Sequence, residues 1–165
     1  MSKYYMGIDQ GTTGTTVLVL DEEWNCLSRG YKEHTQHFPQ PGWVEHDPME
    51  IWEKILESID MAAKEADINM EEVTCIGLDN QGETVVLWDN VTGVPVYNAI
   101  VWQDKRTARE ADVIGEKHGD MIREKTGLVV DAYFSATKIR WIIDHVPGVK
   151  EKIEARRINA GTLDT

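Results

Sequence analysis

The chain has 165 residues, about the length of one domain, of which 41% are hydrophobic and 28% charged, as is ordinary for a globular protein. Lysine and arginine total 17 against 29 aspartates and glutamates, which gives a formal net charge of −12. This excess of negative charge repels nucleic acid and anionic lipid, so we expect neither nucleic acid nor a membrane as a partner.

Three short strands are predicted at the start of the chain, at residues 4–9, 15–21 and 26–33. The first is apolar and the second is rich in β-branched residues, and the segment Gln10 to Gly14 between them is short enough for a hairpin. Residues 21–25 form a turn before the third strand. The chain is therefore predicted to begin with three consecutive antiparallel strands.

A long segment without periodicity, residues 34–48, follows and contains three prolines. Loops of this length often have a function or form an interface, although folding back on its own domain is an equal alternative. The segment ends in a helix start, with Asp47 as N-cap, Pro48 at the first helical position and Glu50 three residues after the cap. Apolar residues then recur with the helical period, which predicts a helix with one face on a core.

The second half of the chain alternates between strand and helix patterns. The near-continuous apolar run at 73–79 predicts a central strand covered on both faces. We then expect a hairpin of strands 84–89 and 95–103, two short helices in 105–127 with breaks near Gly119 and Gly127, a helix at 135–145 with Ser135 as N-cap, a short helix at 149–157 and the start of a strand in 158–165. The order predicts an α/β protein with a mixed sheet flanked by helices.

The cysteines and histidines do not suggest a zinc site. Cys26 and Cys75 each stand alone in apolar, strand-like contexts, so we predict buried free thiols rather than a disulfide. The histidines are scattered, and most are expected to be solvated: His34, His37, His46, His118 and His145. No apolar run approaches the roughly 20 residues that cross a bilayer, and the N-terminus does not resemble a signal peptide. We therefore expect a cytoplasmic protein.

The run DQGTTGTT, from Asp9 to Thr16, has two chemical interpretations. It lacks the lysine of a Walker A loop and the spacing of a dinucleotide-binding loop. Its glycines allow close approach of the backbone, so that N–H groups and threonine hydroxyls can converge on phosphate, with Asp9 on Mg²⁺ or on a water bound to it. The spacing alone is equally compatible with a plain hairpin in which Asp9 is solvated.

Four further segments resemble the glycerol kinases of the FGGY family of carbohydrate kinases. They are PGWVEHDPMEIW (41–52), DNQGETVVLWD (79–89), YNAIVWQDKRT (97–107) and TGLVVDAYFSATKIRWIIDH (126–145). The last contains Tyr133-x-Ser135-x-x-Lys138-Ile139-x-Trp141-Ile142-x-Asp144-His145, which is similar to a signature of the family. The resemblance extends from about residue 5 to 165. It implies a ribonuclease-H-like fold of the actin/hexokinase/Hsp70 superfamily, with residues 1–165 as an incomplete N-terminal part of the first of two domains.

The resemblance also implies a set of site residues. Asp9 matches a position close to Mg²⁺, and the positions that contact the phosphates of ATP match Thr12, Thr13 and Gly14. For the substrate, Glu83 matches a carboxylate that accepts hydrogen bonds from hydroxyls. Tyr133 matches a hydroxyl-binding tyrosine, and Trp102 an aromatic wall, although core packing is the alternative for both rings. The general base of the family is an aspartate beyond residue 165, so no residue here is assigned a catalytic role.

Two residues depart from the glycerol kinase pattern. Gly82 replaces the arginine of the usual NQRET, and a glycine cannot donate hydrogen bonds to substrate hydroxyls as a guanidinium does. Thr16 stands where these kinases often have an arginine near the nucleotide phosphates. Gly82 also enlarges the expected pocket, which suggests a longer polyol or a ketose as substrate.

The sequence thus predicts ATP- and Mg²⁺-dependent phosphoryl transfer to a terminal hydroxyl of a small polyol or sugar by the full-length protein. Residues 1–165 alone are expected to be inactive. The alternatives are a kinase for a different polyol or ketose, and a non-catalytic family member that acts as a binding module. We also expect a homo-oligomer.

Overall fold

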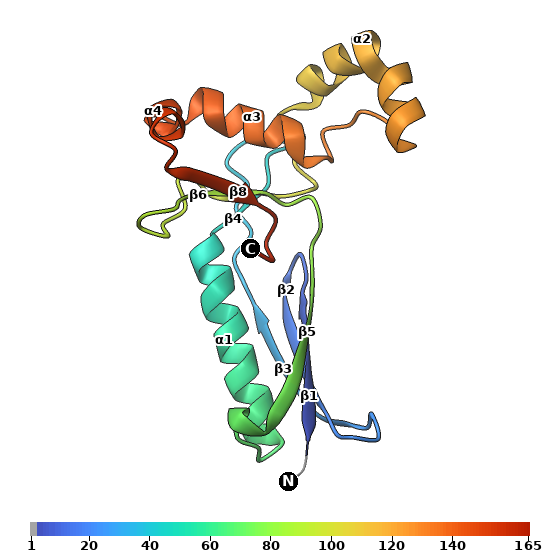
Figure 1. The fold of residues 1–165 in the computed structure, drawn as a ribbon, viewed down its shortest axis with the longest axis vertical. Helices are drawn as coiled ribbons and strands as arrows, with labels where there is room; N and C mark the ends of the chain where they lie inside the picture. The colour runs from blue at the N-terminus through green and yellow to red at the C-terminus, as the bar shows by residue number, and fades with distance from the viewer. Residues whose placement is uncertain (1–2) are drawn as a thin grey trace. The chain divides into compact units, whose positions relative to one another are not determined.

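The computed structural model describes residues 3–165, which fall into two compact units (Figure 1). Unit 1 consists of the described part of Met1–Thr35 together with Asp47–Gln81 and Asp164. Unit 2 consists of Gln36–His46, Gly82–Leu163 and Thr165.

Unit 1 is built on a four-stranded mixed sheet with the order β3-β2-β1-β5. The strands are β1 (Tyr4–Gln10), β2 (Gly14–Leu20), β3 (Cys26–Glu33) and β5 (Val73–Asn80). The first three pair in an antiparallel manner, while β5 runs parallel to β1. The structure therefore confirms the three consecutive antiparallel strands and the mixed sheet.

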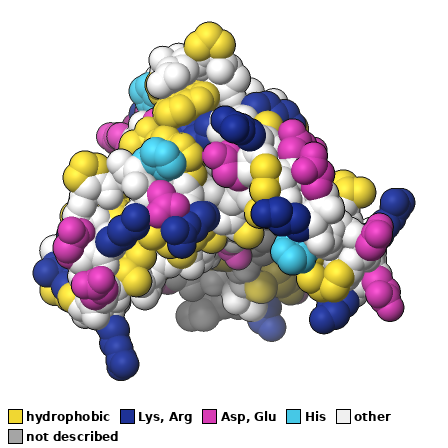
Figure 2. All heavy atoms as spheres, turned by 90° about the horizontal axis from the view of Figure 1, so that it is seen from above, with side chains coloured by type: hydrophobic (Ala, Val, Ile, Leu, Met, Phe, Trp, Pro, Cys, Tyr) yellow, Lys and Arg dark blue, Asp and Glu magenta, His cyan; other side chains and the backbone are white. Residues whose placement is uncertain are grey.

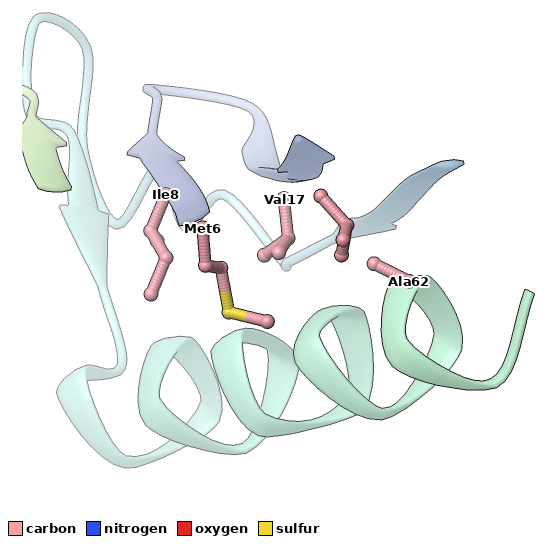
Figure 3. Close-up of a cluster of buried hydrophobic side chains, with 5 residues drawn as sticks. Met6, Ile8, Val17 and Ala62 are labelled. Atoms are coloured by element: carbon pink, nitrogen blue, oxygen red, sulfur yellow. The ribbon is translucent and has the colours of Figure 1, made fainter. Parts of the chain in front are cut away.

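Helix α1 (Pro48–Glu65) packs against one face of this sheet. Asp47 is its N-cap, and the carboxylate accepts a hydrogen bond of 2.8 Å from the Met49 N–H, as the sequence predicts. Figure 3 shows Met6, Ile8 and Val17 pointing from the strands toward the helix, where Ala62 lies. The 3₁₀ helix η1 (Met70–Glu72) then leads into β5. One face of the sheet is thus covered by an apolar cluster that α1 completes.

Strand β5 corrects the prediction of a strand covered on both faces. It lies at the edge of the sheet, and Ile76 and Leu78 are 50% and 52% exposed among the described residues. Cys26 and Cys75 are free, as predicted, but both are exposed rather than buried. An apolar run identifies a strand suited to burial, but it carries no information on which other segments cover it.

Unit 2 contains two small antiparallel sheets and three helices. Strand β4 (Glu45–His46) pairs with β7 (Ala99–Ile100), and β6 (Val86–Asp89) pairs with β8 (Ile158–Gly161). The helices are α2 (Ala108–Thr126), α3 (Ser135–His145) and α4 (Val149–Glu154). The core of this unit contains Val85, Leu87, Ile100 and Ile142.

Two details of unit 2 differ from the sequence predictions. The predicted second hairpin is reduced to isolated bridges, Val85 with Ile100 and Trp88 with Pro95, because β6 uses its main pairing for β8. Helix α2 continues through Gly119, since an internal glycine costs a helix only about 1 kcal/mol; the predicted end at Gly127 is confirmed.

The segment 34–48 is also more ordered than a plain loop. It contains β4 and a bridge between His37 and Glu45. Both His34 and His46 are buried, so these two histidines are exceptions to the expected solvation. Among the described residues, no helix is both long and apolar enough to span a membrane.

Candidate functional site

The turn between β1 and β2 in unit 1 is a tight hairpin that contains three of the predicted phosphate-binding residues. The Gly11 N–H donates a 3.0 Å hydrogen bond to the Gly14 carbonyl, which closes the turn over Thr12 and Thr13. A Cβ atom on Gly14 would lie 2.5 Å from the carbonyl oxygen of Lys32, so only glycine fits there. Thr13 is exposed and Thr12 half-buried. The turn has the compact backbone that an anion-binding loop needs.

Two glutamines that the sequence reasoning did not single out hold this turn. The buried Gln10 donates through Nε2 to the Gly11 carbonyl at 2.8 Å. Gln81, at the end of β5, donates its backbone N–H to the Gln10 carbonyl at 2.8 Å, and its Nε2 to Gln10 Oε1 and the Gly11 carbonyl at 3.3 Å each. The signal that could have identified them is their place in the sequence: Gln10 directly follows Asp9, and Gln81 directly follows Asn80, near the ends of β1 and β5. These bonds fix the position of the turn.

Asp9 lies at the end of β1 on the sheet face opposite α1. In the register it is directly paired with Thr16 on β2 and with Asp79 on β5. Directly paired residues project to the same face, so both carboxylates lie on that face, and both side chains are exposed. Asp79 is a second candidate that the sequence reasoning missed.

These carboxylates suit a water-rich magnesium site better than an all-protein cage. No group of three or more histidine, cysteine, aspartate or glutamate side chains is positioned for a metal ion anywhere in residues 3–165. Mg²⁺ commonly keeps several waters and binds through one or two carboxylates plus substrate phosphate. Asp9, with Asp79 beside it, fits this donor set.

An arginine reaches Thr16 from the neighbouring strand. Arg29 on β3 donates through Nη2 to Thr16 Oγ1 at 3.3 Å, and its guanidinium carbon lies 5.2 Å from the centre of the Tyr31 ring. Position 16 itself carries no cation, but a guanidinium nevertheless lies beside it. Arg29 therefore places a guanidinium next to the position where the glycerol kinase pattern often has an arginine.

His34 adjoins the same turn and is buried. Its backbone N–H donates to the Thr13 carbonyl at 3.4 Å. Burial lowers the pKa of His34, while the Glu50 carboxylate and a backbone hydrogen bond with Thr12 act in the opposite direction.

Glu83 in unit 2 is held by the N-terminus of α3. Its Oε2 accepts hydrogen bonds from the Ser135 N–H at 2.8 Å and from Ser135 Oγ at 2.5 Å. The N-cap position belongs to Phe134, which makes no side-chain cap bond, so the prediction of Ser135 as N-cap is wrong. The carboxylate of Glu83, 52 residues away in the chain, satisfies the N-terminal donors instead.

Trp102 and Tyr133 form an aromatic corner near Glu83. Their ring centroids lie 5.9 Å apart in an edge-to-face arrangement. The backbone N–H of Trp102 donates to Thr84 Oγ1 at 3.2 Å. The Tyr133 side chain is 39% exposed. Neither ring is fully buried, which argues against simple core packing.

Gly82, beside Glu83, has open space where a side chain would be. It is exposed, and no heavy atom lies within 4 Å of the position that a Cβ atom would occupy. The structure thus brings Gly82, Glu83, Trp102 and Tyr133 together within unit 2, and Asp9, Thr12, Thr13 and Gly14 within unit 1.

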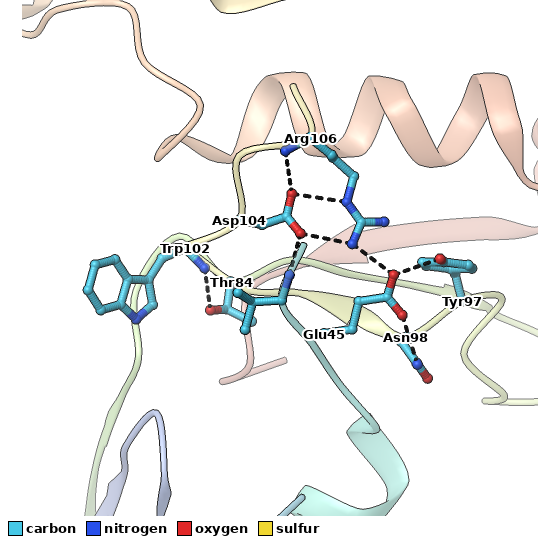
Figure 4. Close-up of polar contacts among 8 residues, drawn as sticks. Glu45, Thr84, Tyr97, Asn98, Trp102, Asp104 and Arg106 are labelled. Carbon is cyan, nitrogen blue, oxygen red and sulfur yellow. Dashed lines mark hydrogen bonds and ion pairs between the residues drawn. The ribbon is translucent and has the colours of Figure 1, made fainter. Parts of the chain in front are cut away.

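A buried charged network fixes the loop from which Trp102 projects (Figure 4). Arg106 donates through Nη2 to Glu45 Oε1 at 2.7 Å and to Asp104 Oδ2 at 2.8 Å. Its guanidinium carbon lies 3.8 Å from the Trp43 ring centre, and Asp104 also accepts the Val44 N–H at 2.7 Å. Sequence reasoning missed this network, because its members are separated by about 60 residues along the chain.

The pKa shifts in this network favour the charged forms of Glu45 and Arg106. Burial alone would raise the pKa of Glu45, but hydrogen bonds from Tyr97, Arg106 and Asn98 outweigh it and lower that pKa. Burial would lower the pKa of Arg106, but hydrogen bonds to Asp104 and Glu45 raise it. Glu45 is therefore a carboxylate and Arg106 a guanidinium at neutral pH.

A groove of about 540 Å³ also lies between α2 and α3 of unit 2, lined by residues that include Val113, Ile114 and Trp141. None of the predicted substrate-binding residues lines it. Figure 2 shows hydrophobic side chains exposed among intermixed acidic and basic ones, without a large area of one charge sign. The groove is thus separate from the predicted substrate-binding residues.

Comparison with solved structures defines the class of fold. The chain superposes on a glycerol kinase from Plasmodium falciparum, solved with ADP, with a TM-score of 0.90 and 37% identity over 99% of this chain and 33% of that chain. A xylulose kinase from Brucella ovis gives a TM-score of 0.79 and 29% identity over 93% of this chain and 30% of that chain. These neighbours are sugar kinases of the actin/hexokinase-like fold, which confirms the predicted fold class.

Sequence comparison is more specific. Residues 4–163 match the N-terminal domain of the FGGY family of carbohydrate kinases, and the chain belongs to this family. It is 53% identical to glycerol kinase 2 of Thermotoga maritima over 99% of this chain and 33% of that protein. It is 49% identical to a glycerol kinase of Bacillus thuringiensis over 100% of this chain and 34% of that protein. The chain spans about a third of the length of the curated relatives it matches.

Proposed function

We propose that the full-length gene product transfers the γ-phosphoryl group of ATP to a terminal hydroxyl of a small polyol or sugar. The observation that carries the proposal is the arrangement in unit 2, where α3 holds the carboxylate of Glu83 beside the edge-to-face rings of Trp102 and Tyr133. A fixed acceptor for hydroxyls beside an apolar wall for C–H groups is the chemistry that a polyol requires.

In this proposal each residue of unit 2 has a defined role. Ser135 occupies Oε2 of Glu83, so we assign Oε1 to the substrate hydroxyls. The Tyr133 hydroxyl bonds a second oxygen of the substrate, and the Trp102 ring contacts its carbon skeleton. These contacts orient the substrate and exclude water from one side of it, which is the positioning that phosphoryl transfer mainly needs.

The turn of unit 1 would bind the phosphates. Backbone N–H groups of the turn and the hydroxyls of Thr12 and Thr13 suit phosphate oxygens, and Gly14 allows the close approach. Asp9 would hold Mg²⁺ through water, assisted by Asp79. When bound, the ion neutralises charge on the phosphates.

The substrate itself is a finer proposal. The relatives favour glycerol, whereas the open space at Gly82 favours a longer polyol or a ketose. The second candidate function, a non-catalytic binding module, is the outcome if the full-length gene product binds a polyol without turnover. The inactivity of residues 1–165 alone, the cytoplasmic location and the homo-oligomer stay predictions.

The test is a substrate panel with the full-length gene product, ATP and Mg²⁺. Glycerol, xylitol, xylulose and gluconate are assayed by coupled detection of ADP, and the product is identified by NMR. We expect phosphorylation of a terminal hydroxyl of at least one compound and no turnover by residues 1–165. If the full-length product consumes no ATP with any member of an extended panel, the proposed function is wrong.

A further inference from the structure

The backbone of Glu83 is in a conformation that its residue type disfavours. Its φ is 63°, in the left-handed region, where residues other than glycine are uncommon. The neighbouring Gly82 would adopt such a conformation without strain, but the positive φ is at Glu83. Conformations of this kind persist only where surrounding contacts enforce them, and they occur preferentially at functional sites.

Two residues of α3 provide such contacts. Ser135 binds the carboxylate of Glu83 through both its N–H and its hydroxyl. Lys138, one turn further along the same face of the helix, donates through Nζ to the backbone carbonyl of Glu83 at 3.3 Å. Side chain and main chain of Glu83 are therefore both held by one helix.

Lys138 also holds the segment that carries Tyr133. The same Nζ donates to the Tyr133 carbonyl, and to the Phe134 carbonyl at 3.4 Å. The side chain is fully buried. A charged ammonium group has three N–H donors, which match these three carbonyls, whereas a neutral amine has only two. A single buried cation thus joins the two loops that carry Glu83 and Tyr133.

The geometry points to Ser135 and Lys138 as positioning residues that hold Glu83 and Tyr133 in the arrangement that binds substrate hydroxyls. This inference rests on the proposed function and deepens it. Neither residue needs to touch the substrate, because each acts through the loops that it holds.

The Lys138 side chain is also expected to lose its charge within the pH range of an ordinary enzyme assay. Burial lowers the pKa of Lys138 to about 8. The carboxylates of Glu83, Asp104 and Asp131 favour the charged form, and the ammonium group of Lys105 opposes it. Above this pH the amine has lost one donor, so one of its three carbonyl contacts is lost. We therefore expect binding of the polyol to weaken as the pH rises through about 8.

The first experiment compares Ser135→Ala with Ser135→Thr in the full-length gene product. Steady-state kinetics use glycerol and xylulose as probes, together with ATP. Loss of the hydroxyl bond to a carboxylate raises KM for the polyol about tenfold in Ser135→Ala and leaves KM for ATP within about twofold. Ser135→Thr keeps the hydroxyl and restores KM. Equal effects on both substrates, or none, would overturn the inference.

The second experiment uses the pH profile of Lys138→Met, which keeps the length of the side chain but has no donor. Wild type is expected to lose kcat/KM for the polyol above about pH 8. The variant has a low kcat/KM throughout and lacks this alkaline limb. Lys117→Met, at an exposed position of α2, is the matched control and keeps the wild-type profile. An unchanged alkaline limb in Lys138→Met contradicts the role of Lys138.

The outcomes separate the two proposals. If wild type phosphorylates a polyol but Ser135→Ala and Lys138→Met behave like wild type, the positioning inference fails and the proposed function stands. If wild type phosphorylates nothing in the panel, the proposed function fails, and the positioning inference, which rests on it, fails as well.

Discussion

Replacement of Gly82 by arginine tests the substrate pocket directly. No heavy atom lies within 4 Å of the added Cβ position, and the φ of Gly82 is outside the left-handed region, so we expect no steric or backbone penalty. Loss of glycine flexibility in the unfolded chain instead stabilises the protein by about 0.4–1 kcal/mol. A guanidinium that donates to a substrate hydroxyl contributes about 1.5–3 kcal/mol.

At about 1.4 kcal/mol per factor of ten, this contribution corresponds to a rise in kcat/KM for glycerol of about ten- to a hundredfold. The bulkier side chain also lowers kcat/KM for xylulose, because it fills the space that a longer substrate would use. Both values are measured by coupled detection of ADP in the full-length gene product. Gly82→Met, of similar length but without a donor, is the control. An equal gain in Gly82→Met, or no gain in Gly82→Arg, would refute the assignment of the pocket.

Three further predictions concern residues that support the site. Arg106→Met leaves two buried carboxylates without their cation, so we expect the free energy of unfolding in urea to fall by about 3–5 kcal/mol. The control Arg140→Met removes an exposed ion pair and changes this free energy by at most about 1 kcal/mol. Similar losses in both variants would contradict a stabilising role of the buried network. The folded-state pKa of His34 is lowered, so the unfolded chain binds more protons and stability is lost as the pH falls below about 6.5; His34→Gln is expected to flatten the unfolding free energy between pH 7 and 5, and an unchanged slope would refute this. Arg29→Ala is expected to raise KM for ATP about two- to fivefold with KM for the polyol unaltered, and the reverse pattern would place Arg29 elsewhere in the mechanism.

Local signals were sufficient for much of the fold. Asp47 and Pro48 identify the start of α1, and the β-branched run after the DQGTTGTT loop identifies β2, because capping and strand propensity depend on neighbouring residues. The predicted break at Gly119 is wrong, because one internal glycine costs a helix only about 1 kcal/mol. The prediction that β5 is covered on both faces is wrong, because an apolar run does not show which other segments pack against the strand.

In the candidate site, the residues could be predicted from the sequence but the contacts that hold them could not. Its residue types and their motifs are local, so Asp9, Gly14, Glu83 and Tyr133 are identifiable from the sequence. How they are held is not local. Glu83 is bound by a serine 52 residues later, and the Arg29 contact with Thr16 depends on the register between β2 and β3. Such contacts follow from tertiary pairing, which no short motif encodes.

We propose that the carboxylate of Glu83 binds the hydroxyls of the polyol that the full-length gene product phosphorylates. The most direct measurement is kcat/KM of Glu83→Gln against wild type, in the full-length gene product with ATP, Mg²⁺ and the best substrate of the panel. A hydrogen bond to a charged acceptor contributes about 1.5–3 kcal/mol, so its loss is expected to lower kcat/KM for the polyol about ten- to a hundredfold. The change is expected in KM for the polyol, with KM for ATP nearly constant. A Glu83→Gln variant that phosphorylates the polyol as efficiently as wild type would show that the Glu83 carboxylate does not bind the substrate hydroxyls.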